Sequence, residues 1–140
     1  MSATERYRQH HTELHALFAR IEGLLHNTAG NGWAGELTRL LAEFTGRLST
    51  HLSVEDTSLY PTLTASGNPA LAAMAQRYQT EMGDLYSTYM DFWRRWRTPA
   101  QVQREMAAFL PEARQLFSRL KGRIHREDTE LYALADKVLA

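Results

Sequence analysis

Cysteine is absent from the 140-residue sequence, and this absence excludes several kinds of chemistry at once. Disulfide bonds, thiolate metal sites and cysteine nucleophiles are ruled out, so histidine and carboxylate side chains are the metal ligands that remain. Net charge is lacking as well, because 16 Lys and Arg residues balance 16 Asp and Glu residues. No overall field therefore attracts nucleic acid or an anionic membrane surface, and we expect neither as a partner.

Long hydrophobic runs are also missing. No stretch approaches the roughly 20 consecutive apolar residues that a membrane-spanning helix needs. The N-terminal sequence MSATERYRQHH is polar and lacks the apolar segment of a signal peptide. We therefore expect a cytoplasmic protein. The length fits a single domain of residues 1–140, in which folding buries roughly two-thirds of the surface of the unfolded chain.

Apolar residues recur at the spacing of an amphipathic helix along nearly the whole chain, without strand-like alternation. Chain breaks fall only at residues 27–32, 66–69 and 98–99. At the last two, Asn68 and Thr98 precede proline, which is the pattern of a helix N-cap followed by proline at the first helical position. Three breaks predict four helices, and the short connections favour an all-α, up-down-up-down four-helix bundle. We expect the helices near residues 3–27, 33–65, 69–97 and 99–139.

The two halves of the sequence are related to each other. The segment TELHALF (12–18) recurs in outline as TEMGDLY (80–86), and EDTSLY (55–60) recurs as EDTELY (127–132). The first match relates the first predicted helix to the third, and the second match relates the second helix to the fourth. This internal repeat predicts a bundle made of two related helical hairpins.

Several ionisable residues fall on helix faces that the apolar pattern assigns to the core. His11 and His15 lie one turn apart on the first helix, and His51 and Glu55 lie one turn apart on the inward face of the second. Glu127 continues the inward series of the fourth helix. Because burying unpaired ionisable groups costs several kcal/mol each, a bound cation is the simplest compensating partner. His10 and His26, by contrast, are expected to face solvent.

The fourth helix offers a second pair of candidate ligands, His125 and Glu130. His125 lies about 200° from Glu127 around a helix of 3.6 residues per turn, so the two alternatives place different faces inward. We favour Glu127, because Leu116 and Leu120 lie on its face and because it preserves the repeat.

The segment from His51 to Pro61, HLSVEDTSLYP, resembles the motif of the hemerythrin and HHE cation-binding family. Members of this family are up-down bundles that hold two non-haem irons bridged by two carboxylates. The resemblance spans essentially the whole chain, and the fourth helix follows the same motif from its glutamate onward. It implies an iron site in this protein. The metal ligands that the resemblance implies are His11, His15, His51, Glu55 and Glu127.

Three positions depart from the family pattern. Gln79 and Gly83 stand where the repeat would place the histidines of the third helix, and Arg123 stands where the fourth helix would have one. We therefore predict one iron ion per chain rather than two. We also predict that the Arg123 guanidinium takes the place of the second metal and balances Glu55 and Glu127, because its planar fork suits carboxylates.

The resemblance implies a metal-binding protein that binds or senses a diatomic ligand, O₂ or NO, or that handles iron. No side chain stands out as a general base or nucleophile for an organic substrate, so binding is favoured over enzymatic catalysis. An oxidase or peroxidase-like reaction at the iron is a further alternative. The alternative from another functional class is a metal-free bundle that acts as an interaction or dimerisation module, with Trp93 and Trp96 as its contact patch. A homodimer is the assembly that this alternative predicts.

Overall fold

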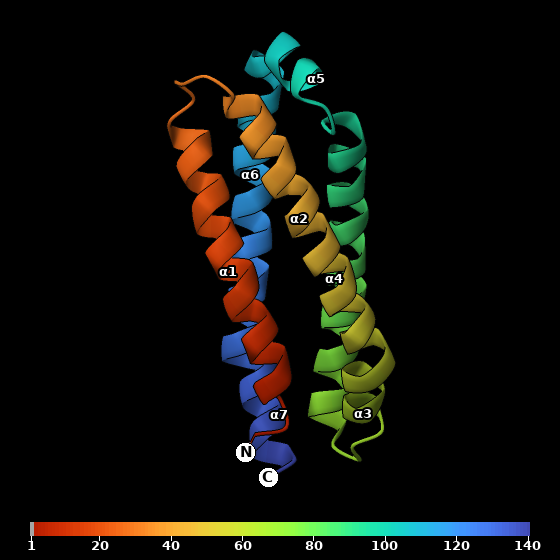
Figure 1. The fold of residues 1–140 in the computed structure, drawn as a ribbon. Coiled ribbons are helices and arrows are strands. Elements are labelled where there is room, and N and C mark those ends of the chain that lie inside the picture. Colours follow the sequence, from red (N-terminus) through yellow and green to blue (C-terminus); the bar gives the residue numbers. More distant parts are fainter. Residues whose placement is uncertain (1) are drawn as a thin grey trace.

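The computed structural model describes residues 2–140, which form four long helical rods packed side by side (Figure 1). Successive rods run in opposite directions, and both chain ends lie at the same end of the bundle. The predicted all-α, up-down-up-down bundle is confirmed. The first rod is α1 (Glu5–His26), and the third is α4 (Pro69–Arg95). The second contains α2 (Trp33–Val54), η1 (Glu55–Leu59) and α3 (Tyr60–Thr64), and the fourth contains α5 (Pro99–Arg104), α6 (Met106–Arg126), η2 (Glu127–Leu131) and α7 (Tyr132–Val138).

The third and fourth rods begin where the sequence predicts. The Asn68 side chain accepts a hydrogen bond from the backbone N–H of Leu71 at 3.0 Å, and Thr98 caps the next helix in the same way. The fourth rod is not one continuous helix as predicted, because the chain turns at Glu105. The turn lets the short α5 pack against α2 and bury Val102, which explains the break.

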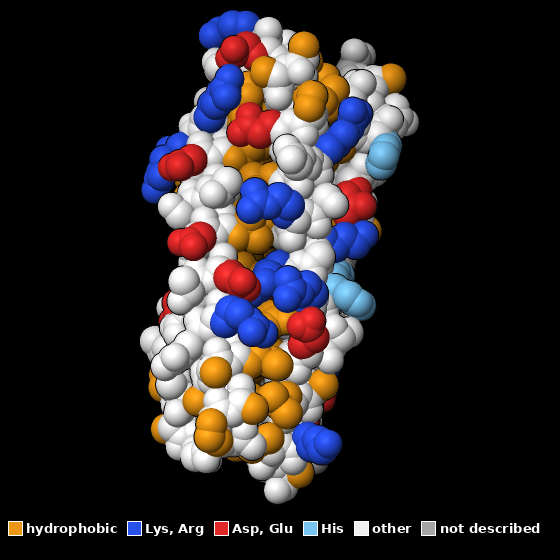
Figure 2. Space-filling model, turned by 180° about the vertical axis from the view of Figure 1, so that it is seen from behind, with side chains coloured by type: hydrophobic (Ala, Val, Ile, Leu, Met, Phe, Trp, Pro, Cys, Tyr) orange, Lys and Arg blue, Asp and Glu red, His pale blue; other side chains and the backbone are white. Residues whose placement is uncertain are grey.

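Charged side chains of both signs lie side by side on the face of the molecule seen in Figure 2. Figure 2 shows one face, on which Lys and Arg side chains lie beside Asp and Glu side chains, with hydrophobic atoms visible in the seam between helices. This mixture agrees with the zero net charge. Among the helices of residues 2–140, none has the length and apolar character needed to cross a membrane.

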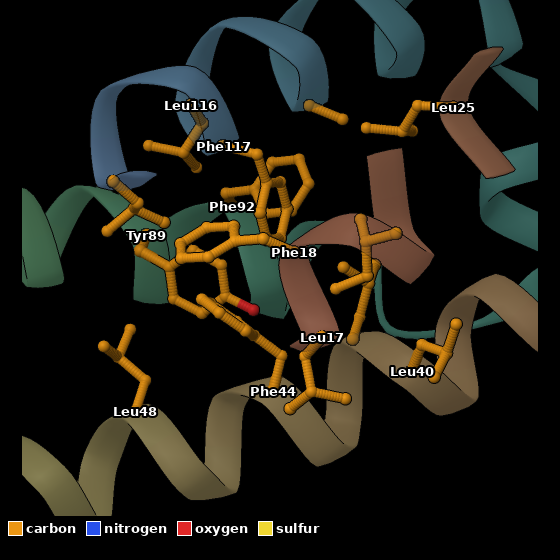
Figure 3. Close-up of a cluster of buried hydrophobic side chains, with 14 of the residues drawn as sticks. Leu17, Phe18, Leu25, Leu40, Phe44, Leu48, Tyr89, Phe92, Leu116 and Phe117 are labelled. Carbon is orange, nitrogen blue, oxygen red and sulfur yellow. The ribbon is translucent and has the colours of Figure 1, made fainter. Parts of the chain in front are cut away.

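The interior contains two hydrophobic clusters with a polar layer between them. The larger cluster joins all four rods, and its centre holds Phe18, Phe44 and Phe117 (Figure 3). The Phe44 ring lies 5.0 Å from that of Phe18 and 5.1 Å from that of Phe117, measured between centroids. The smaller cluster, around Tyr60 and Tyr132, fills the end of the bundle near the termini. Four of the candidate ligands, His11, His51, Glu55 and Glu127, are buried in the layer between the two clusters.

Two π-helical segments, η1 and η2, occupy equivalent positions of the repeat. The N–H of Tyr60 donates to the carbonyl of Glu55, five residues back, and the N–H of Tyr132 donates to that of Glu127. In an α-helix, residues five apart point about 140° away from each other. The wider π turn reduces this angle, so the glutamate and the tyrosine of each segment are both buried. The sequence repeat therefore corresponds to a structural repeat.

Gly83 in α4 offers a test of helix stability. A Cβ atom at this position would meet nothing within 4 Å, and glycine in a helix interior costs about 0.5–1 kcal/mol relative to alanine. We expect Gly83→Ala to raise the melting temperature by about 1–4 °C in circular dichroism. Gly67→Ala is the matched control and should lower it, because Gly67 has a φ of +80°. A lower melting temperature for Gly83→Ala would contradict the expectation.

Candidate metal centre

His11, His51 and Glu55 direct three potential ligand atoms toward one buried point. His11 Nε2 lies 2.9 Å from His51 Nε2, and His51 Nε2 lies 3.1 Å from Glu55 Oε1. The three ligand atoms lie within 4.8 Å of one another, and all three residues are buried. Two imidazoles and a carboxylate in this arrangement can hold a metal ion.

Glu127 brings a second carboxylate to the same point. Its Oε1 atom lies 3.8 Å from His11 Nε2, and its side chain is completely buried. The Oε1 atoms of Glu127 and Glu55 are both buried without a hydrogen-bond partner. An unpaired buried carboxylate oxygen is costly, and a cation is the partner that would compensate both. The residues present therefore fit a metal ion.

The outer nitrogens of the two histidines are already engaged. His11 Nδ1 lies 2.8 Å from Asp128 Oδ1, and His51 Nδ1 lies 3.0 Å from His10 Nδ1. Because a carboxylate can only accept, Asp128 assigns the His11 proton to Nδ1 and leaves a lone pair on His11 Nε2. The His51 Nε2 atom faces this lone pair at 2.9 Å, and a cation bound between the two Nε2 atoms would take the place of a shared proton. Histidine ligands commonly have such a carboxylate on the outer nitrogen.

Two tyrosines hold the carboxylates from opposite rods. The Tyr60 hydroxyl donates to Glu127 Oε2 at 3.0 Å, and the Tyr132 hydroxyl donates to Glu55 Oε2. The two contacts are related by the repeat, since each tyrosine reaches the glutamate of the other π segment. The Tyr132 hydroxyl also lies 3.3 Å from His11 Nε2. Each Oε2 atom is thus anchored, while each Oε1 atom is left without a hydrogen bond.

Burial shifts the protonation equilibria of the centre. It lowers the pKa of His51 to about 4, with the charge of Asp128 acting in the opposite direction, so the imidazole is neutral near pH 7. It raises the pKa of Glu55 to about 7, against the hydrogen bond from Tyr132. Burial, together with the charge of Glu55, also raises the pKa of Glu127 well above its usual range. A bound cation would favour the ionised form of both carboxylates.

His15 lies outside the group of convergent ligand atoms. Its ring is half-buried and tilted against that of Phe18, with the centroids 5.9 Å apart. Burial lowers its pKa, and Asp128 is the charge that most opposes this effect. A ligand role for His15 would require its side chain to turn away from Phe18, and it stays a prediction.

The fourth rod presents Glu127 to the interior, as the favoured register predicts. Glu127 is completely buried, whereas His125 and Glu130 are exposed. The Glu130 carboxylate instead accepts a hydrogen bond from the Tyr78 hydroxyl at 2.6 Å. The alternative register, with His125 and Glu130 as ligands, is therefore wrong.

The third rod keeps the outer contact of the repeat but lacks the imidazole. Gln79 Nε2 donates to Asp56 Oδ1 at 3.1 Å, which is the counterpart of the contact between His11 and Asp128. Gly83 contributes no side chain and borders a cleft of about 330 Å³ between α2 and α4. The third rod therefore offers no histidine to a second metal ion.

Arg123 does not form the predicted direct pairs with Glu55 and Glu127, although its charge acts against the burial that raises the pKa of Glu127. Its guanidinium pairs with Glu81 and lies 4.1 Å from the centroid of the Tyr78 ring. The Glu81 side chain is 48% exposed, so pairing there avoids placing another charge in the dry centre. The tyrosine hydroxyls already hold both glutamates in place of the guanidinium.

Sequence reasoning missed two residues that contact the histidine ligands. Asp128 holds His11, and the repeat could have indicated it, because Glu-Asp recurs at both π segments. His10 is half-buried against His51, whereas we expected it to face solvent. Adjacent residues on a helix point about 100° apart, so periodicity alone gave no signal for His10.

Asp128 should strengthen metal binding by holding the His11 tautomer. Outer contacts of this kind are worth about 10–100-fold in metal affinity, and we expect a loss in that range for Asp128→Ala in competition titrations. Asp56→Ala is the matched control, because Asp56 is the repeat counterpart and contacts Gln79 rather than a histidine. Equal affinities for the two variants would show that the Asp128 contact does not support the centre.

The fold and the site together define a four-helix-bundle metal-binding domain. A family model described as the hemerythrin HHE cation binding domain matches residues 2–135. The match covers nearly the whole chain, so the protein belongs to this family, and the predicted resemblance is confirmed. Comparison with curated proteins and with solved structures gives no significant match.

Proposed function

We propose that this protein binds one iron ion between His11, His51, Glu55 and Glu127 and presents an open position on that ion to a diatomic gas, O₂ or NO. The observation that carries the proposal is the pair of facing Nε2 atoms beside two unpaired carboxylate oxygens. Two imidazoles with carboxylate and no thiolate form a donor set typical of non-haem iron with open positions. The bound ion would supply the gas-binding position, while the chain orients the donors and excludes bulk water.

The residues at the second metal position of the family favour a single ion per chain. Gln79 and Gly83 replace the two histidines of the third rod, and Arg123 replaces the counterpart of His51. Arg123 turns to Glu81 rather than to the centre. A second ion would therefore find carboxylates but no imidazole.

Anaerobic titration of the metal-free protein with ferrous iron tests this proposal. We expect saturation near one ion per chain by elemental analysis of the desalted protein. Saturation near two would overturn the single-ion centre, and no retained iron would overturn metal binding altogether.

Addition of NO to the iron-loaded protein then separates gas binding from iron handling. Gas binding predicts a new visible absorption band and an altered electron paramagnetic resonance spectrum. Unchanged spectra with iron still bound would overturn the gas-binding role and favour iron handling.

The alternative of a metal-free interaction module depended on Trp93 and Trp96 as a contact patch. Trp96 is completely buried, and its indole N–H donates to Glu112 at 3.2 Å. Trp93 is partly buried, with the Arg97 guanidinium 4.6 Å from its ring centroid. Trp96 therefore cannot contact a partner without unfolding of this end of the bundle. Dimerisation itself stays a prediction, which sedimentation equilibrium would test.

A further inference from the structure

A groove of about 510 Å³ lies between α1 and α2, and His51 is one of the residues that line it. Leu14 lines it on the α1 side, and Gly46 and Thr50 line it on the α2 side. A Cβ atom at Gly46 would meet nothing within 4 Å, so the absence of a side chain leaves this part of the groove open. The groove thus connects solvent with a residue of the metal centre.

The His51 ring lies between this groove and the interior of the centre. Its Nδ1 atom lies 3.0 Å from Nδ1 of His10, which also lines the groove. Its Nε2 atom lies 2.9 Å from Nε2 of the buried His11. A cation in the groove would meet His10 as the first imidazole and His51 directly behind it.

The mouth of the groove carries carboxylates from two different helices. Glu13 of α1 and Glu43 of α2 share a single cation, Arg47, whose Nη1 lies 2.9 Å from Glu13 and whose Nε lies 3.8 Å from Glu43. These three side chains are 44–58% exposed, and all three line the groove. Arg20 lines the adjoining pocket beside the same three side chains, so the two carboxylates matter here as oxygen ligands for a passing cation rather than as an excess of negative charge.

We propose that this groove is the route by which the metal ion reaches the centre, with Glu13 and Glu43 as its first oxygen ligands and His10 passing it to His51. The inference rests on the proposed function, because it presupposes that the centre binds a metal ion. Imidazole and carboxylate are both suitable transient ligands for a divalent transition metal. The route predicts an effect on the rate of loading and none on the number of ions bound.

The cleft between α2 and α4 provides a matched comparison. It borders Tyr60 and Gly83 but none of the four proposed ligands. Gly83 resembles Gly46 in lying within a helix and in having free space around its Cβ position. The same large substitution can therefore be made in the groove and in the cleft.

Gly46→Leu and Gly83→Leu test the route by the rate of ferrous iron uptake. Metal-free protein is mixed anaerobically with Fe²⁺, the reaction is stopped by excess chelator at set times, and protein-bound iron is measured. We expect Gly46→Leu to slow uptake about tenfold, an added barrier of about 1.4 kcal/mol, with unchanged final stoichiometry. Gly83→Leu should load like the wild type. Equal rates for Gly46→Leu and the wild type, or slower loading of Gly83→Leu, would overturn the route.

Variants of Glu13, Glu43 and His10 test the same route without depending on whether Gly46→Leu folds. The double variant Glu13→Gln and Glu43→Gln should load more slowly than the wild type, because neutral amides are weaker ligands than carboxylates for a divalent cation. His10→Ala should slow loading, and because it also removes the outer contact of His51, its rate is measured at saturating iron. Unchanged rates in the double variant would overturn the role of the mouth, and an unchanged or faster rate in His10→Ala would overturn its transfer role. Failure of the wild type to bind iron would instead overturn the proposed function.

Discussion

Replacement of His51 by alanine is expected to abolish stoichiometric metal binding. Its Nε2 atom lies close to ligand atoms of two other residues, 2.9 Å from His11 Nε2 and 3.1 Å from Glu55 Oε1. Because the loss of outer contacts alone costs about 10–100-fold in affinity, the loss of this inner ligand should exceed about 100-fold. Isothermal titration with ferrous iron, checked by elemental analysis of the desalted protein, measures the effect.

His15→Ala and His26→Ala are the controls for this variant. His26 is exposed at the end of α1, far along the helix from His11, and its removal should leave the affinity unchanged. The placement of His15 against Phe18 predicts a small effect there as well. A loss for His15→Ala as large as that for His51→Ala would support the predicted three-histidine centre, with His15 turning inward when metal binds. Stoichiometric binding by His51→Ala would contradict the proposed centre.

Replacement of Glu127 by glutamine is expected to change the stability of the metal-free and metal-bound forms in opposite directions. Glu127 Oε1 is buried without a partner and lies 3.8 Å from His11 Nε2. An amide at this position can donate toward that nitrogen and can still accept the Tyr60 hydrogen bond through its carbonyl. Relief of an unsatisfied buried group is worth about 1–3 kcal/mol, so the metal-free variant should melt at a higher temperature than the metal-free wild type.

The metal-bound forms should show the reverse order. In the wild type, metal at about 1,000 times its dissociation constant stabilises the fold by about 4 kcal/mol, which raises the melting temperature by about 8–16 °C. Glu127→Gln should lose most of this increase, because a neutral amide replaces an anionic ligand. Glu36→Gln, at an exposed position in the first turn of α2, is the control and should keep it. A metal-free Glu127→Gln variant less stable than the wild type would contradict the strain assigned to the unpaired oxygen.

Local sequence patterns determined the order of the rods and part of the ligand set of the metal centre. Apolar periodicity and the caps at Asn68 and Thr98 predict the rods and their order, because these signals depend on neighbours within one or two turns. The same periodicity predicts that Glu127 rather than His125 faces inward. The repeat predicts the relation between the π segments, and Gln79 and Gly83 already show that the third rod lacks histidine.

Only the tertiary structure decided how these side chains meet across the bundle. Arg123 pairs with Glu81 instead of the buried carboxylates. Helical periodicity cannot predict this, because the choice of partner depends on how much it costs to remove the guanidinium from water at each place it can reach. The crossed hydrogen bonds of Tyr60 and Tyr132 likewise depend on how far the second and fourth rods lie from each other.

The absence of cysteine and the inward histidines and glutamates were sufficient to predict a metal centre built from imidazole and carboxylate. The sequence did not determine which imidazoles converge, because His10, His11 and His15 lie on one helix within two turns. Helix periodicity gives the direction of each side chain from its own axis, whereas convergence also depends on the position of the neighbouring rod. The structure therefore pairs His11 with His51, places His10 in the groove and leaves His15 beside Phe18.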